Sequence, residues 1–388
     1  MTQRRQPDLV VVGLGAMGSA VVYHAAKRGL RVVGIDRFSP PHVWGSTHGQ
    51  SRITREAIGE GEQFVPLAQH SHLLWRALEE ETGAALLHQC GGLVLSRRGT
   101  ASRMHAQDDF FGNTVRAAKR FGIAHELLSA NEIRARFPRF AASGEEQGYF
   151  EPGAGWLDPE ACVAAHLERA ISHGAQLHRD LQVTDVRLDQ GCIEIVCPRE
   201  TFRPARVVVA AGAWLPGLLP GFSVDRLIVR RQVMHWFEDR APASDQPVFI
   251  WHWGAGEEDV FYGFPGSGGA LKVAAEQLAG RDDPDNVQRE VGVEESRAFF
   301  DRHAKGRLAG AGPACVRSAT CLYTVAPRAN FVIDKVPENS NAIAVSACSG
   351  HGFKHSAAIG KWVAEWVHTG ERPTVLAPFA REHFLKDD

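Results

Sequence analysis

The sequence predicts an α/β protein of two domains, one of which is a discontinuous, Rossmann-like domain with a parallel sheet. Three apolar segments have the composition of buried parallel strands, at residues 9–12, 205–211 and 342–346. Each of them runs into a glycine-containing turn. A chain of 388 residues is long enough to form two domains, each with its own core.

The first strand leads into the motif G-x-G-x-x-G at Gly13, Gly15 and Gly18, followed by a predicted helix over 19–28 and a second strand over 31–35. In such a unit the first glycine permits a sharp turn and the second lets the backbone approach a pyrophosphate. The third lets the helix pack closely against the strand. The free N–H groups at the start of the helix favour a phosphate group.

An acidic residue, Asp36, ends the second strand, and Arg37 follows it. An acid at this position accepts hydrogen bonds from the ribose hydroxyls of an adenosine. Ala16 and Met17 lie in the glycine-containing turn itself. Together these residues predict a dinucleotide-binding site, and the motif by itself leaves both FAD and a nicotinamide cofactor open.

Composition argues against several other classes of protein. The net charge of −2 gives no electrostatic reason to expect a nucleic acid or a membrane surface as partner. No apolar segment approaches the roughly 20 residues of a membrane span. The seven cysteines are scattered without C-x-x-C pairs, which argues against a disulfide scaffold or a metal site. We therefore expect a cytoplasmic protein, since the first strand begins at residue 9 without a signal peptide.

Two other regions break the alternation of strands and helices and predict a second domain. Residues 85–150 contain a predicted helix over 104–121, and residues 219–317 have a β-like pattern. In the second region Trp236, Trp251 and Trp253 belong either to the core or to a substrate pocket. The expected boundaries assign residues 1–84, 151–218 and 318–388 to the nucleotide-binding domain.

A glycine- and hydroxyl-rich loop over residues 45–55 is a candidate for contact with a ligand. Arg52 and Arg55 are three positions apart, so on a helix they would point into one site. The chain uses far more arginine than lysine, yet Lys272 and Lys354 follow glycine-rich apolar segments. This context indicates a functional role rather than an exposed surface position for both.

The chain resembles the monomeric sarcosine oxidase family of flavoenzymes, which includes N-methyltryptophan, pipecolate and fructosyl-amino acid oxidases. The matching motifs, in order along the chain, are GLGAMGSA, GSTHGQSRITR, GEGEQFVPLA, YGFP at 262–265, CLYT at 321–324 and SGHGFK at 349–354. The resemblance implies FAD as the cofactor. It also implies an FAD-binding domain of the glutathione-reductase or D-amino-acid-oxidase type and a substrate domain with a mixed or antiparallel sheet.

The resemblance also implies roles for single residues. Cys321 matches the cysteine that binds FAD covalently through a thioether, and Lys272 matches a lysine beside the flavin where oxygen reacts. The remaining residues implied in catalysis are Arg52, His48, Tyr262 and Tyr323. The residues expected to bind the cofactor are Gly13, Gly15, Ala16, Met17, Gly18, Asp36, Arg37, Ser46, Gly212, Cys321, Gly350, Gly352, Phe353 and Lys354.

By the same resemblance, Arg55 and Lys354 hold the carboxylate of the substrate. Two positions differ from sarcosine oxidases: Glu276 stands where they have a histidine that contacts the substrate, and Cys348 stands where an aromatic residue is expected. The segment 249–253 is also rich in aromatic residues. These differences imply a pocket shaped for another or larger secondary amine, in which Glu276 favours a cationic group or an ordered water.

The implied reaction is oxidation of a secondary, N-methylated amino acid to an imine, with oxygen reduced to hydrogen peroxide. An oxidase of a cyclic imino acid or of an Amadori compound is the nearest alternative. A flavin dehydrogenase with another electron acceptor and a non-catalytic cofactor-binding module are further alternatives. The expected partners are a small amino acid and oxygen, and the family favours a monomer.

Overall fold

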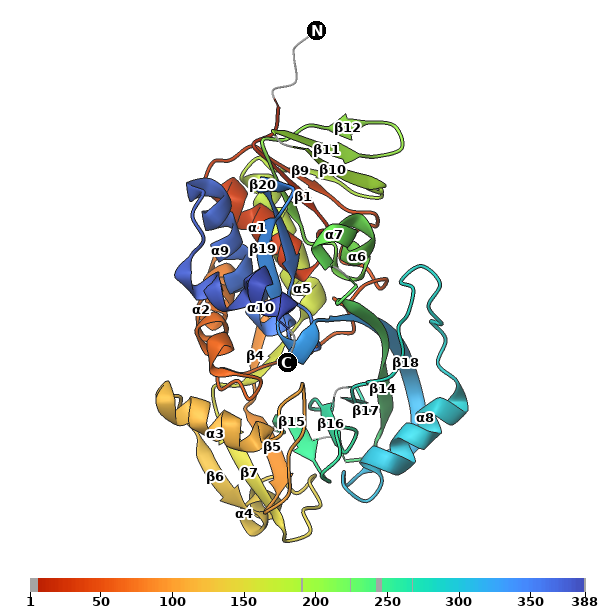
Figure 1. Ribbon diagram of the computed structural model, residues 1–388. Coiled ribbons are helices and arrows are strands. Elements are labelled where there is room, and N and C mark those ends of the chain that lie inside the picture. Colours follow the sequence, from red (N-terminus) through yellow and green to blue (C-terminus); the bar gives the residue numbers. More distant parts are fainter. Residues whose placement is uncertain (1–5, 190, 224, 242–245, 267, 387–388) are drawn as a thin grey trace.

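The computed structural model describes residues 6–189, 191–223, 225–241, 246–266 and 268–386 (Figure 1). Its upper part in Figure 1 holds a parallel sheet with helices beside it, and its lower part holds a larger, curved sheet. The chain passes between the two parts several times, so segments far apart in the sequence contribute strands to each of them. This confirms the predicted α/β fold.

The sheet of the upper part contains the three predicted parallel strands. Parallel pairing joins β1 to both β2 and β13, β13 to β20, and β2 to β9, whereas β19 pairs antiparallel with β20. The strands, in their order across the sheet, are β19 (Val332–Val336), β20 (Asn339–Ser346), β13 (Arg206–Val209), β1 (Leu9–Val12), β2 (Val32–Ile35) and β9 (Gln176–His178).

Helices pack beside this sheet and beside one another. Helix α1 begins at Ala16, directly after the glycine turn, and contacts both α5 and α9. The closest approach is at Gly360 in α9, where an added Cβ would lie 2.3 Å from the Cβ of Ala20 in α1. The helices of this part are α1 (Ala16–Lys27), α2 (Val65–Thr82), α5 (Pro159–Ser172), α6 (Leu215–Leu218), α7 (Pro220–Ser223), α9 (Ser356–Thr369) and α10 (Arg381–Leu385).

The large sheet of the lower part is mixed. Strands β15 and β5 pair parallel, whereas every other pair of neighbouring strands in this sheet is antiparallel. This confirms the second half of the predicted fold class. The strands, in order, are β18 (Ala311–Val325), β14 (Ile228–Asp239), β17 (Ala270–Ala274), β16 (Val260–Gly263), β15 (Val248–His252), β5 (Gly92–Arg97), β7 (Glu146–Glu151) and β6 (Glu126–Ser129). The expected boundary at residue 318 falls inside β18, which pairs with β14 along most of its length.

The two faces of the large sheet have different roles because side chains alternate along each strand. On β17, Leu271 and Val273 belong to a buried cluster with Trp251 and Phe237. The helices α4 (Ala130–Arg136) and α8 (Val293–Phe299) lie in this part of the molecule (Figure 1). The opposite face carries Lys272, which points toward the upper part of the molecule.

Two small antiparallel sheets complete the strands. One consists of β3 (Arg52–Thr54), β8 (Gly155–Leu157) and β4 (Leu87–Gln89). The other consists of β10 (Asp185–Asp189), β11 (Cys192–Val196) and β12 (Thr201–Phe202).

The helix expected over residues 104–121 is shorter in the structure, where α3 spans Phe110–Arg120. Asp109 begins it as the N-cap, with its carboxylate accepting a hydrogen bond from the backbone N–H of Gly112. His105 and Ala106 have φ values of +50° and +60°, which a right-handed helix excludes. The first part of the expected helix is therefore a loop, and this loop carries His105 to the site described below.

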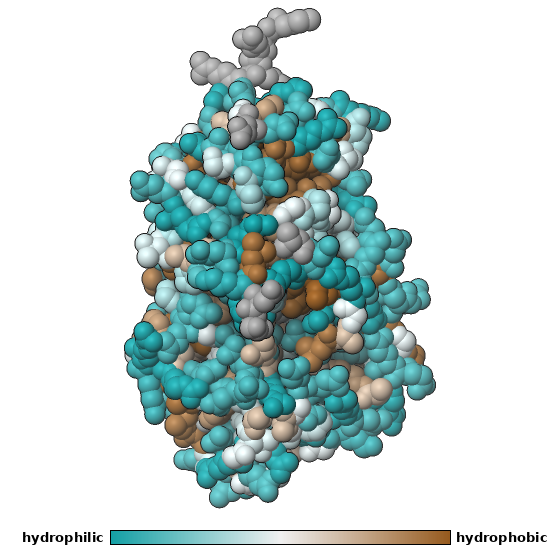
Figure 2. All heavy atoms as spheres, in the orientation of Figure 1, coloured by the Kyte–Doolittle hydropathy of each residue, from teal (hydrophilic) through white to brown (hydrophobic). Residues whose placement is uncertain are grey.

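The face shown in Figure 2 is mostly hydrophilic, with hydrophobic side chains in small, separate groups. None of the described helices combines the length and the hydrophobicity that crossing a membrane requires.

The contact between α1 and α9 yields a prediction about stability. Substitution of Gly360 by Ala forces the helices apart, because the new Cβ would also lie 2.7 Å from the backbone carbon of Ala20. We expect a loss of about 1–3 kcal/mol in the free energy of unfolding. Thermal unfolding monitored by circular dichroism measures this loss of stability. Gly153→Ala is the control, since an added Cβ there meets no atom within 4 Å; equal melting temperatures for the two variants would contradict the prediction.

Candidate functional site

A cavity of about 450 Å³ lies between the two large sheets. The ends of β1, β2 and β20 in the upper sheet reach it through Val12, Ile35 and Ser346. These are the carboxyl ends of the parallel strands, where open α/β sheets bind their ligands. The other wall is the face of the large sheet that carries Lys272.

The glycine motif forms a cradle at one end of the cavity. An added Cβ on Gly13, whose φ is +90°, would lie 2.5 Å from the carbonyl oxygen of Ala210. One on Gly18 would lie 1.7 Å from the carbonyl oxygen of Gly13, so this glycine packs beneath the turn and does not line the cavity. Gly15 faces open space, with its nearest neighbour, the hydroxyl of Thr47, 3.7 Å from an added Cβ. The start of α1 thus offers its backbone N–H groups to an anionic ligand.

Asp36 lies beside this cradle and is almost fully buried. Its carboxylate accepts hydrogen bonds from the N–H groups of Leu14 at 2.7 Å and Phe38 at 2.8 Å, so it fixes both turns that border the cavity. The neighbouring Arg37 pairs with Asp285 at 2.6 Å. The indole N–H of Trp214 donates to the same carboxylate oxygen at 2.8 Å. Sequence reasoning missed Asp285, which comes from the segment between β17 and α8.

A second glycine turn faces the cavity from the other side. Gly350 has a φ of +80°, and an added Cβ on Gly352 would lie 1.7 Å from the carbonyl oxygen of Ala347. The turn leads through Phe353 into α9. Of the residues expected to bind the cofactor, those that line the cavity are Gly13, Gly15, Ala16, Met17, Asp36, Arg37, Ser46, Gly212, Cys321, Gly350, Gly352, Phe353 and Lys354.

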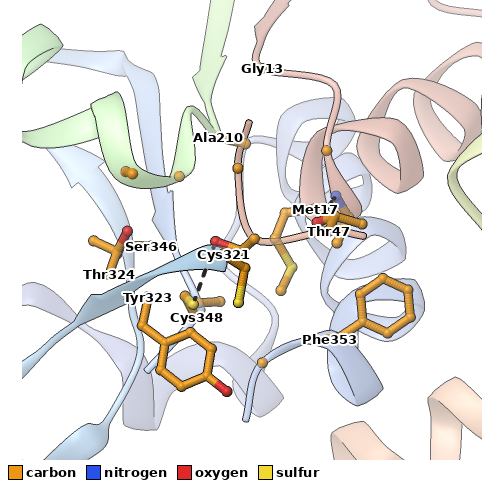
Figure 3. A pocket seen from close by; sticks show the side chains of 18 of the residues that line it. Gly13, Met17, Thr47, Ala210, Cys321, Tyr323, Thr324, Ser346, Cys348 and Phe353 are labelled. Carbon is orange, nitrogen blue, oxygen red and sulfur yellow. Dashed lines mark hydrogen bonds between the residues drawn. The ribbon is translucent and has the colours of Figure 1, made fainter. Parts of the chain in front are cut away.

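Strand β18 places Cys321 and Tyr323 on the same face, two residues apart, and both side chains face the cavity (Figure 3). Burial raises the pKa of the Cys321 thiol, although Arg52 acts in the opposite direction. The Sγ of Cys348 lies 4.0 Å from the hydroxyl of Ser46, as the dashed line in Figure 3 shows.

The phenol groups of Tyr262 and Tyr323 are 3.1 Å apart and hydrogen-bonded. Burial raises the pKa of Tyr262 to about 12, and it also raises the pKa of Tyr323. Both phenols therefore stay protonated and act as hydrogen-bond donors at neutral pH.

Lys272 and Arg52 place two positive charges on the large-sheet side of the cavity. The Lys272 amine donates to the carbonyl oxygens of Gly49 at 2.6 Å and Ser51 at 2.8 Å. Arg52 donates to the carbonyl oxygens of Ser46 at 2.7 Å and Ser51 at 2.9 Å. Burial lowers the pKa of Lys272, and the nearby Arg52 lowers it further. The acceptors named here are neutral, so neither side chain forms an ion pair with them, and Glu160 acts on Lys272 only from a distance.

His48 lies behind this pair and does not line the cavity. Burial lowers its pKa to about 3, with a further contribution from Arg52, so the imidazole is neutral at physiological pH.

Arg55 and Lys354 lie together, as predicted, but an internal carboxylate accompanies them. Glu60, with 5% of its surface exposed, accepts a hydrogen bond from Arg55 at 2.6 Å, and its other oxygen lies 3.9 Å from the Lys354 amine. Burial works to raise the pKa of Glu60, but Arg55 and Lys354 outweigh it and hold the pKa well below its usual value. Burial lowers the pKa of Lys354 to about 8 against the opposing effect of Glu60.

Glu276 does not line the cavity. It lies behind His105, whose Nε2 is 3.3 Å from the Glu276 carboxylate. Burial raises the pKa of Glu276, and His105 acts against this shift. Sequence reasoning missed His105, which lines the cavity itself, because a helix was expected at this position. The only available signal was the N-cap pattern at Asp109, which starts the helix later.

The aromatic segment 249–253 contributes only Ile250 to the cavity wall. Phe249 and Trp251 alternate with it and belong to the core on the opposite face of the sheet, and Trp253 packs against that core. Trp236 stacks over the Lys272 amine, 5.4 Å from the ring centroid, without lining the cavity. The three tryptophans are therefore core residues, and the aromatic segment does not reshape the pocket.

The cavity fits FAD on several grounds. Two glycine turns leave room for backbone contact with a ligand at the starts of two helices. The basic side chains of the buried Lys272 and the half-buried Arg52 face the same space, and the Nε of Arg55 is buried without a hydrogen-bond partner among the described residues. Gly15, Asp36 and Gly350 would hold the dinucleotide, and the face of β18 with Cys321 would meet the flavin ring.

Residues 8–366 match the protein family described as FAD dependent oxidoreductase. Among curated proteins, monomeric sarcosine oxidase from Bacillus sp. (strain B-0618) is 35% identical over 381 residues, covering 96% of this chain and 95% of the relative. N-methyl-L-tryptophan oxidase from Yersinia pestis (strain Pestoides F) is 32% identical over 386 residues, covering 97% of this chain and 99% of the relative.

Among solved structures, NikD, described as an unusual amino acid oxidase essential for nikkomycin biosynthesis, has the same fold. It superimposes with a TM-score of 0.84 at 23% identity and covers 97% of each chain.

Proposed function

Because the chain belongs to the family of FAD-dependent oxidoreductases, we propose that it is an oxidase of secondary, N-methylated amino acids. The family membership confirms the resemblance seen in the sequence motifs. The observation that carries the proposal is the charge arrangement of one cavity. Arg55 and Lys354, which are suited to bind a carboxylate, line the same cavity as Lys272 and Arg52, which face the expected flavin position.

The proposed substrate is a neutral secondary amine with a carboxylate group. Bound FAD supplies the two-electron oxidant that converts the C–N bond of this amine to an imine. Water hydrolyses the imine, which yields an aldehyde and an amino acid if the substrate is N-methylated. Oxygen takes up the two electrons and leaves as hydrogen peroxide.

The carboxylate of the substrate is held by Arg55 and Lys354. The guanidinium group offers a planar pair of donors, and the amine adds a point charge. In the structure Glu60 occupies this position, so the substrate carboxylate must share Arg55 with it or replace it. The protonated Tyr262 and Tyr323 also line the cavity, and because one phenol donates to the other, one O–H remains free to donate to a ligand.

Reduction of oxygen begins with the formation of superoxide, and a fixed positive charge stabilises it. Lys272 and Arg52 supply that charge in a buried place, where it acts more strongly than in water. This supports oxygen as the acceptor rather than another protein or a quinone. Because Glu276 faces His105, the proposed substrate needs no cationic side chain.

The first prediction concerns the activity itself. We expect the purified protein to produce hydrogen peroxide and an aldehyde with one or more N-methyl amino acids, whereas cyclic imino acids react more slowly. A peroxidase-coupled assay over a panel of both classes measures this. Reduction of an artificial electron acceptor without any peroxide would indicate a dehydrogenase instead. No peroxide with any member of the panel would refute the proposal.

A second prediction concerns Cys321, for which we propose a thioether bond to the 8-methyl carbon of FAD. Forming this bond would break the S–H bond and one C–H bond of the methyl group, and the two electrons would pass to the flavin and then to oxygen. The thiolate is the attacking form, and burial raises the pKa of Cys321, so the attachment rate should rise with pH from neutral to alkaline conditions. To measure this rate, FAD is added to the apoprotein and samples are precipitated with acid at intervals. Covalently attached flavin stays in the pellet, and free flavin stays in the supernatant.

We expect Cys321→Ser to leave all of the flavin in the supernatant. Cys315→Ser is the matched control, because Cys315 lies on the same strand but packs against the opposite core. Free flavin from the unmodified protein would overturn the covalent bond and leave the FAD fold intact.

A third prediction separates the two halves of the reaction. Lys272→Met keeps the length of the side chain and removes its charge, so reoxidation of the reduced flavin by oxygen should slow by roughly a hundredfold. Reduction of the flavin by the substrate without oxygen should change much less. Stopped-flow absorbance measures both rates, with Lys305→Met as the control for an exposed lysine. An unchanged reoxidation rate would exclude Lys272 from oxygen chemistry.

A further inference from the structure

His105 lies between the carboxylates of Glu60 and Glu276, beside the expected substrate position in the cavity. Its Nδ1 lies 3.3 Å from Glu60 and its Nε2 lies 3.3 Å from Glu276. Each of the three side chains has less than one tenth of its surface exposed. The ring thus faces a carboxylate oxygen through both of its nitrogens.

The loop that carries His105 has a conformation that its side-chain contacts must maintain. His105 and Ala106 both have left-handed backbone angles, which residues other than glycine rarely adopt. Such strain persists where the surrounding structure holds it, and it is concentrated at functional sites. The loop lies between β5 and α3, and it reaches the cavity with Met104 and His105.

Glu60 is the point at which His105 meets the carboxylate-binding pair. Its Oε2 accepts the hydrogen bond from Arg55, whereas its Oε1 faces both His105 at 3.3 Å and Lys354 at 3.9 Å. His351 also faces Oε1 at 4.0 Å, but burial lowers the pKa of His351 well below its usual value, so it adds no charge. His105 and Lys354 therefore compete for one oxygen atom, and His105 is nearer.

The Lys354 amine remains available as a result. Among the described residues it donates one hydrogen bond, to the carbonyl oxygen of His351 at 2.7 Å. Without His105, Glu60 would move onto the amine and neutralise it, because opposite charges attract strongly in a buried site. Arg55 and Lys354 would then both be paired with Glu60, and neither would be free to bind an incoming carboxylate.

We propose that His105 is a positioning residue for substrate binding, which holds Glu60 away from Lys354 and so keeps that amine free for the substrate carboxylate. Glu276 fixes the ring from its other side. The inference rests on the proposed function for the identity of the ligand, a carboxylate. It also explains the glutamate at position 276, which acts on the substrate through His105 rather than by contact.

Binding of a simple carboxylate to the holoenzyme tests this role. The probe is cyclopentanecarboxylate, which has no nitrogen to oxidise, and titration calorimetry gives its Kd. We expect His105→Ala to raise the Kd roughly tenfold, because Glu60 would then pair with Lys354 and the carboxylate would lose its charge-assisted hydrogen bond from that amine. His105→Asn should raise it less, because the amide can still donate to Glu60. In turnover, the same variants should raise KM and leave kcat nearly unchanged.

Two further variants separate positioning from a general loss of structure. Glu276→Gln should weaken binding in the same direction as His105→Asn, since the ring then loses one charged partner. Arg103→Ala is the control on the same loop, because its side chain is exposed and pairs only with Asp108 among the described residues. We expect the Kd of this control to equal that of the unmodified protein.

The deciding measurement is a double-mutant cycle with Glu60→Gln. If His105 acts through Glu60, adding His105→Ala to Glu60→Gln changes the Kd less than twofold. A tenfold effect that persists in the Glu60→Gln background would overturn the proposal, as would the absence of any effect in His105→Ala. A protein that binds the carboxylate but oxidises no N-methyl amino acid would refute the proposed function and leave the role of His105 standing.

Discussion

The Lys272 ammonium group ties the two parts of the molecule together at the cavity. It extends from β17 in the large sheet and donates to backbone carbonyl groups of the loop that follows β2, at Gly49 and Ser51. The ring of Phe264 lies 4.5 Å from the amine on another side. The loop conformation and the positive charge of the cavity therefore depend on the same side chain, and burial of that charge is tolerated because neutral oxygens surround it.

The two ends of the cavity balance their charges differently, and this difference matches two chemical tasks. Lys272 and Arg52 donate to neutral carbonyl groups, so in the proposed reaction their charge would be available to stabilise an anion. Arg55 and Lys354 face Glu60 instead, which neutralises part of their charge before any ligand binds. If a substrate carboxylate binds there as proposed, it enters a site that already holds one carboxylate, and this costs less than leaving the cations buried without a partner.

The parts of the structure that local sequence determines were predictable, and the parts that depend on distant contacts were not. The turn around Gly13 and Asp36 follows from residues within one βαβ unit, so the sequence pattern alone predicted its conformation. Lys272 and Cys321 were assigned through family motifs, which carry information that periodicity lacks. The sequence did not predict His105, Glu60 and Asp285 as site residues, because their positions matter through partners far away in the sequence, such as Glu276 for His105. A left-handed backbone at His105 leaves no composition signal when the residue is not glycine.

The large sheet explains how one scaffold keeps a cofactor site and a stable core apart. Along β17, Leu271 and Val273 enter the core, whereas Lys272 and Ala274 turn toward the cavity. On the cavity side of this sheet, Cys321 packs in a cluster with Met234, Trp236 and Ala274. Because neighbouring residues point to opposite faces, a substitution on the cavity side changes the shape of the site without disturbing the packing behind it. In the proposed oxidase, substrate preference would therefore be adjusted through this face and through the loop that carries His105, while contacts with the backbone hold the glycine turns fixed.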